Sequence, residues 1–118
     1  MNEEKEYFRG DTFVFPFDLQ NEDKEPINFE TGDILRFGMK ESIYSDTYLL
    51  YDEKTISENT EEIKIIFKPE ETQKLQPNKK YIIELEITRG DYTDTIFQKE
   101  IFVKGDVVNN VPKINSDT

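Results

Sequence analysis

The feature that most constrains this chain is an alternation of apolar and polar residues with a period of two. In residues 12–19, TFVFPFDL, every second position from Phe13 to Leu19 is apolar, and the pattern recurs in DILRFGMKE, EEIKIIFK and YIIELEITR. Successive side chains of a β-strand point to opposite faces, so this period indicates strands that each bury one face. The sequence therefore predicts an all-β fold.

The apolar members of these strands are the expected core. They are Phe13, Phe15, Phe17, Leu19, Leu35, Phe37, Met39, Ile63, Ile65, Phe67, Tyr81, Ile83, Leu85 and Ile87. Another strand is predicted over TYLLYD, and the last over residues 93–105, where Lys99 interrupts an apolar face. Near Lys99 we expect a bulge or a sheet edge. Pro16 places one side of its strand at an edge, and Gly38 indicates a bulge or a close backbone approach.

One short helical turn is predicted near residues 69–75, PEETQKL, because Pro69 suits the first helical position and two glutamates follow it. Short, turn-rich segments separate the strands and no long helix intervenes. This spacing favours a single antiparallel β-sandwich of about seven strands. We assign the sandwich to residues 7–106, with an N-terminal tail at 1–6 and a C-terminal tail at 107–118.

Composition argues against an enzyme. The 118 residues are enough for one domain and contain no Cys and no His, which excludes thiol chemistry and the histidine-based triads. The five glycines are isolated, so no phosphate-binding loop is present. Glu84 and Glu86 lie on the outward parity of a strand and are interpreted as a solvated face. A calcium site at Asp91 and Asp94 lacks the dense spacing of known loops. We expect no catalytic residue, cofactor or metal.

The formal net charge is −11, with acidic residues spread along the whole chain. Binding of nucleic acid or of anionic membranes needs clustered Lys and Arg, so neither partner is expected. No apolar run approaches the roughly 18–20 residues of a membrane-spanning helix, and the polar start MNEEKEYFRG does not resemble a signal peptide. The charge favours basic protein partners.

The triplet Arg-Gly-Asp occurs twice, at residues 9–11 and 89–91. Four of the five glycines precede Asp, in Gly10-Asp11, Gly32-Asp33, Gly90-Asp91 and Gly105-Asp106. Gly supplies positive φ and Asp bonds to nearby backbone, so these pairs are predicted turns rather than adhesion motifs. Arg89, Gly90 and Asp91 are expected to form an exposed hairpin tip.

The segment SIYSDTYLLYD concentrates aromatic residues in a short strand. Tyr44, Tyr48, Leu49, Leu50 and Tyr51 form the candidate interface, because Tyr is enriched where proteins meet. A place in the core explains these residues equally well, and the sequence leaves both interpretations open.

Two stretches resemble a known family. The first reads Arg9-Gly10-Asp11-Thr12, then Glu25-Pro26-Ile27-Asn28, Thr31-Gly32 and Arg36-Phe37-Gly38-Met39-Lys40. The second reads Leu75-Gln76-Pro77-Asn78-Lys79-Lys80-Tyr81, followed by an alternating strand and a hairpin. Together they resemble an immunoglobulin-like domain of phage and prophage virion proteins, similar to the N-terminal domain of phage baseplate upper proteins. Asn78 stands where that family often has Gly, and one extra residue precedes Tyr81.

The resemblance implies an immunoglobulin-like sandwich in which Tyr81 forms a tyrosine corner, its hydroxyl bonding to backbone upstream. It also implies a structural or accessory protein of the virion, assembled in the cytoplasm of a bacterial host. Its partners would be other virion proteins, in a homo-oligomer or symmetric array. The extended C-terminal region of baseplate and fibre proteins does not follow here, which favours an adaptor or decoration role over receptor binding. The alternative is an acidic phage-encoded inhibitor that mimics nucleic acid.

Overall fold

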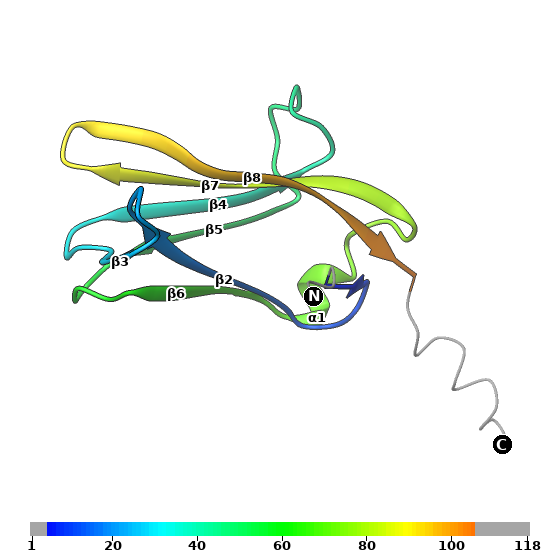
Figure 1. The fold of residues 1–118 in the computed structure, drawn as a ribbon. Helices are drawn as coiled ribbons and strands as arrows, with labels where there is room; N and C mark the ends of the chain where they lie inside the picture. Colours follow the sequence, from blue (N-terminus) through cyan, green and yellow to red (C-terminus); the bar gives the residue numbers. More distant parts are fainter. Residues whose placement is uncertain (1–4, 106–118) are drawn as a thin grey trace, which may run out of the picture.

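The computed structural model describes residues 5–105, which form two facing sheets and one short helix (Figure 1). The strands are β1 Tyr7–Phe8, β2 Phe13–Gln20, β3 Pro26–Ile27, β4 Ile34–Lys40, β5 Leu50–Thr55, β6 Glu62–Phe67, β7 Lys79–Arg89 and β8 Tyr92–Lys104, and the helix is α1 Pro69–Thr72. The predicted all-β sandwich is confirmed. The predicted tail at residues 107–118, Asp106 and residues 1–4 lie outside the described residues.

The two sheets have the strand orders β1-β8-β7-β4-β5 and β3-β2-β6. The central β8-β7-β4 trio and the facing β2-β6 pair correspond to the G-F-C and B-E strands of an immunoglobulin sandwich. One pairing departs from the antiparallel expectation, because β1 runs parallel to β8. Strand β1 lies at the edge of the larger sheet and runs in the same direction as β8. After β1 the chain crosses to the other sheet, where β2 begins.

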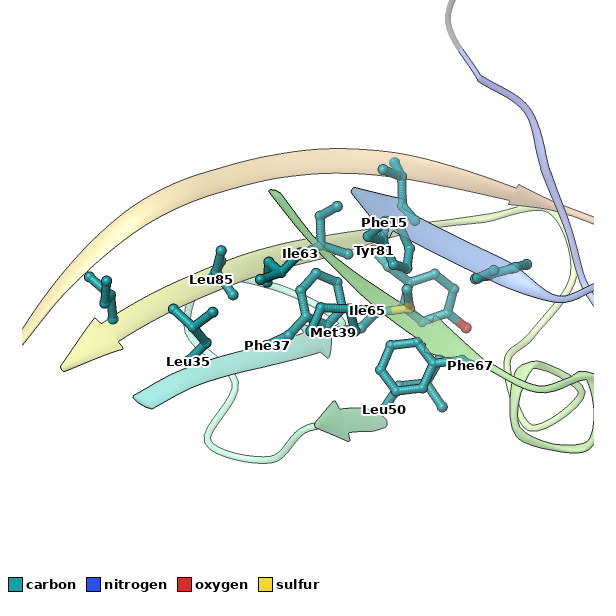
Figure 2. Packing of buried hydrophobic residues seen from close by; sticks show 14 of the residues in the cluster. Phe15, Leu35, Phe37, Met39, Leu50, Ile63, Ile65, Phe67, Tyr81 and Leu85 are labelled. Atoms are coloured by element: carbon teal, nitrogen blue, oxygen red, sulfur yellow. The ribbon is translucent and has the colours of Figure 1, made fainter. Parts of the chain in front are cut away.

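The core lies between the sheets and is rich in aromatic rings (Figure 2). Phe15 from β2 stacks on Phe37 from β4 with 4.8 Å between ring centroids, and Phe67 from β6 packs 5.7 Å from Phe37. The side chains of Leu35, Phe37 and Ile65 are wholly buried. Phe17 and Leu19, which lie farther along β2, are half-buried. Alternation thus identified the inward faces, and burial of these rings is the main stabilising contribution.

The sequence predicted a bulge or a sheet edge near Lys99, and β8 has both. Among the described residues, its outer side is paired only at Val103 and Lys104, and its bulge lies before Lys99. The register between β7 and β8 shifts after Leu85, so that Phe97 faces Leu85 while Thr95 faces Glu86. The extra residue is Ile96, which places the bulge three positions before Lys99. Two adjacent apolar side chains, Ile96 and Phe97, can therefore both reach the core margin.

Smaller elements depart from the sequence predictions at their ends. The strand expected over TYLLYD begins at Leu50 and continues to Thr55, because the preceding residues form a loop. Helix α1 ends at Thr72, and turns complete the segment to Leu75. The two-residue strands β1 and β3 carry no recognisable alternation at that length, and the sequence did not predict them.

Tyr81 opens the buried part of β7 and has the geometry of a tyrosine corner. Its side chain is buried, and its hydroxyl oxygen accepts a hydrogen bond of 2.7 Å from the backbone N–H of Gln76. Asn78, in the intervening turn, has a φ of 59°. Asn tolerates this left-handed conformation, so it can replace the Gly that the related pattern usually has.

Candidate docking surface

The first Arg-Gly-Asp triplet is bound to helix α1. The Arg9 Nε atom donates to the carbonyl of Gln73 at 3.0 Å, and the Gly10 N–H donates to Thr72 Oγ1 at 3.0 Å. The buried Thr72 hydroxyl in turn donates to the carbonyl of Asp11 at 2.8 Å. These bonds give the triplet a structural role as the connection between β1 and β2.

The second triplet forms the tip of the β7–β8 hairpin, with Gly90 and Asp91 exposed in a two-residue turn. Its arginine side chain points elsewhere. Arg89 donates from Nε and Nη2 to the two carboxylate oxygens of Asp33, at 2.8 and 2.7 Å. The guanidinium is therefore engaged within the chain. The φ angles of Gly10, Gly32 and Gly90 are 89°, 97° and 61°, which confirms the predicted turn role of these glycines.

Exposed apolar side chains gather in the loop between β4 and β5 and at the start of β5. Five of the nine large apolar side chains exposed in the described residues lie here, namely Ile43, Tyr44, Tyr48, Leu49 and Tyr51, and we call them the aromatic patch. Tyr44 is 86% exposed. The loop rises from the outer face of the larger sheet, away from β2 and β6 (Figure 1). Such a concentration in one segment is typical of a contact surface.

The patch is fixed to the sheet by the ring of Tyr48, which lies directly on Gly38 of β4. A Cβ atom at position 38 would collide with that ring. The Tyr48 hydroxyl donates to Glu84 Oε2 at 3.0 Å, and the ring lies 5.5 Å from that of Tyr51. The predicted close approach at Gly38 is thus made by a side chain, and no bulge forms there.

An ion pair between Lys40 and Glu84 lies beside the Tyr48 ring. Lys40 Nζ lies 3.2 Å from Glu84 Oε2 and 5.6 Å from the centre of the Tyr48 ring. Burial acts to raise the pKa of Glu84, but hydrogen bonds from Gln98, Tyr48 and Lys40 outweigh it and lower that pKa. Burial, together with the bond to Glu84, raises the pKa of the Tyr48 phenol. A charged carboxylate therefore holds a neutral phenol in place.

Glu86 is paired in the same way, since its Oε1 atom lies 3.3 Å from Nη1 of Arg36. Glu84 and Glu86 consequently brace the outer face of the sheet. This agrees with their predicted outward parity, but the Glu84 side chain is only 18% exposed because Tyr48, Gln98 and Lys40 contact it, so it is not part of a solvated face.

One residue of the predicted interface belongs elsewhere, and another was missed. Leu50 is 5% exposed and lies in the core beside Met39, its partner across β4 and β5, so its assignment to the interface was wrong. Strand pairing turns Leu50 inward while its neighbours Leu49 and Tyr51 point outward. Ile43 is 51% exposed and adjoins Tyr44. Its place beside Tyr44 in the aromatic segment SIYSDTYLLYD was a signal in the sequence that could have indicated it.

Within residues 5–105, no group of three or more acidic side chains is arranged to hold a metal ion. No helix in the same part of the chain is long and apolar enough to cross a membrane. Comparison with family models, with curated proteins and with solved structures gives no significant match. The family resemblance therefore depends on the residues quoted for it above.

Proposed function

We propose that this chain is a non-enzymatic accessory or adaptor protein of a phage virion, docking to a neighbouring virion protein through the aromatic patch. The observation that carries the proposal is the gathering of exposed apolar side chains in one segment, residues 43–51, with Tyr48 fixed to the sheet. These side chains are Ile43, Tyr44, Tyr48, Leu49 and Tyr51. A preorganised aromatic surface loses little entropy when a partner binds it. The resemblance to phage immunoglobulin-like domains supplies the virion context.

The net charge of −11, and the carboxylate of Glu53 that accepts a hydrogen bond from the Tyr51 hydroxyl, favour a partner with a basic contact surface. In a symmetric particle, many copies of a modest contact would add up by avidity. The protein would be made in the cytoplasm of the bacterial host and incorporated during assembly.

The proposal is tested by quantitative mass spectrometry of purified particles from the source phage. We expect the chain at a copy number, relative to the major capsid protein, that matches a symmetry of the head or tail. Absence from particles combined with abundance in infected cells would refute the virion role. That result would leave the acidic nucleic-acid mimic as the hypothesis to pursue, which the high negative charge motivates.

A further inference from the structure

The outer edge of β8 is open along most of its length in the described residues. Strand β7 pairs with β8 on one side from Tyr92 to Val103, whereas β1 pairs with it on the other side at Val103 and Lys104. Before Val103, the backbone groups that point away from β7 therefore have no neighbouring strand in residues 5–105. A row of such groups is a template for another strand.

A groove with a volume of about 300 Å³ lies along this open edge. Its lining consists of Lys5, Glu6, Tyr7, Lys80, Lys99, Glu100, Ile101, Phe102 and Lys104. Four cations against two carboxylates give the groove a positive balance on a chain of net charge −11. Lys104 is paired with Glu6 at 2.8 Å, and Lys80 lies 3.9 Å from Glu100. Lys99 has no carboxylate partner among the described residues.

Lys99 occupies an unusual position on the strand. It shares the parity of Ile101 and Val103, which are buried, and it stands opposite Ile83 of β7. An inward-facing charge on an edge strand opposes addition of an apolar strand, as does the bulge at Ile96. An added strand with a carboxylate opposite Lys99 would instead form an ion pair there. The edge is thus selective for acidic segments.

A second copy of this edge is a poor occupant. In an antiparallel pairing that keeps the two inner faces on the same side, the registers centred on Lys99 and on Glu100 place Lys99 opposite Lys99 and Glu100 opposite Glu100. Registers farther along the strand need Val103, which β1 already pairs, and registers farther back include the bulge at Ile96. Like charges directly opposite each other destabilise a strand pair. The charge pattern therefore favours a different protein.

We infer that the β8 edge binds an extended segment of a partner protein as an added strand, with an acidic residue facing Lys99 and apolar residues two positions to either side. The apolar residues would lie beside Phe97 and Ile101, and main-chain hydrogen bonds would supply most of the affinity. This surface is separate from the aromatic patch, and the inference does not depend on the proposed function.

The test uses the full chain labelled with ¹⁵N and two synthetic peptides. Each peptide has ten residues that alternate Thr with Val, and one Val position is replaced by Glu in the first peptide and by Lys in the second. We expect the Glu peptide to shift the NMR signals of the amides of residues 97–102 and to slow their hydrogen exchange. The Lys peptide should bind about fivefold more weakly. The substitution Lys99→Glu should reverse this preference.

Lys64→Glu is the matched control, because it makes the same charge change at an exposed position of β6, in the other sheet. It should leave the peptide preference unchanged, and circular dichroism verifies that both variants are folded. Equal binding of the two peptides, or no binding of the Glu peptide at millimolar concentration, would refute the inference. So would an unchanged preference in Lys99→Glu. If Lys99→Val self-associates while the wild type binds neither peptide, Lys99 only protects the edge.

Discussion

At the scale of single residues, two contacts explain the roles of Gly38 and Asp33. Gly38 has no side chain, which lets the Tyr48 ring lie on β4 and hold the aromatic patch against the sheet. Asp33 is buried, and its carboxylate accepts two hydrogen bonds from Arg89 and one from the backbone N–H of Glu30. The pairs Gly38–Tyr48 and Asp33–Arg89 join residues that are distant in sequence, so neither pair could be read from a local pattern.

Gly38→Ala is expected to displace Tyr48 and to break its hydrogen bond to Glu84. Replacing a strand Gly by Ala normally stabilises by roughly 0.5–1 kcal/mol, because Gly loses more backbone entropy on folding. We therefore expect Gly38→Ala to destabilise the wild type but to stabilise the Tyr48→Ala variant. Urea denaturation of the two single variants and the double variant measures this coupling. Equal effects in both backgrounds would contradict the contact.

Asp33→Asn is expected to lower the free energy of unfolding by about 2 kcal/mol at neutral pH, because it removes a buried charge-assisted pair. The hydrogen bonds from Arg89 hold the pKa of Asp33 below its usual 3.8. A carboxyl whose pKa is lower in the folded state stabilises the fold above its unfolded pKa and loses this effect as the pH falls through the folded pKa.

The difference between wild type and Asp33→Asn should therefore stay constant above roughly pH 5 and shrink below pH 3.8. Denaturant titrations at a series of pH values measure it. Asp91→Asn, at the exposed hairpin tip, is the control and should show no such difference. A difference that does not shrink as the pH falls below 3.8 would contradict the ion pair.

At the scale of elements, α1 serves as an anchor for the chain between β1 and β2. The helix has one turn and contributes little by itself, but its buried Thr72 joins it to Gly10 and Asp11. The backbone N–H of Lys68 donates to Glu71 Oε1 at 2.8 Å, which closes the start of the helix. The Arg-Gly-Asp-Thr segment is therefore part of the scaffold.

Thr72→Val keeps the shape of the side chain but leaves the Gly10 N–H and the Asp11 carbonyl without their partner. We expect it to lower the free energy of unfolding by about 1–3 kcal/mol. Thr72→Ser retains the hydroxyl and loses one methyl group, so about 0.8 kcal/mol is expected. Chemical denaturation of both variants compares them. A Ser variant that is less stable than the Val variant would show that packing, and not hydrogen bonding, secures the anchor.

At the scale of the whole molecule, the residues that stabilise the fold differ from the most exposed residues of the proposed docking surface. The core between the sheets holds the fold (Figure 2), whereas the side chains of Ile43 and Tyr44 in the aromatic patch are 51% and 86% exposed. Changes at Ile43 and Tyr44 should therefore alter docking without altering folding.

The double substitution Ile43→Ser and Tyr44→Ser is expected to leave the free energy of unfolding within about 0.5 kcal/mol of wild type. Incorporation into phage particles should fall at least about tenfold, because exposed aromatic anchors dominate binding energy. Thermal denaturation and mass spectrometry of particles measure the two effects. Tyr92→Ser, which removes an aromatic residue that is 65% exposed beside the hairpin tip, should incorporate normally. A similar loss for both variants would refute a specific role of the patch.

The sequence by itself determined the six longer strands, their inward faces and the Gly-Asp turns at residues 10, 32 and 90. Alternation and Gly-Asp pairs act over a few neighbouring residues, so Phe37, Ile65 and Leu85 were predicted as core correctly. Even Tyr81, whose hydroxyl bonds only five residues upstream, was within reach of a local pattern.

Tertiary structure alone decided what the remaining side chains do. Strand pairing turned Leu50 into the core and left Tyr44 outside, although both belong to one aromatic segment. The contacts of Arg89 with Asp33, and of Tyr48 with Gly38, span 56 and 10 residues. Such contacts depend on which strands become neighbours. That choice is made by burial of the whole core, so no local stretch of sequence encodes it.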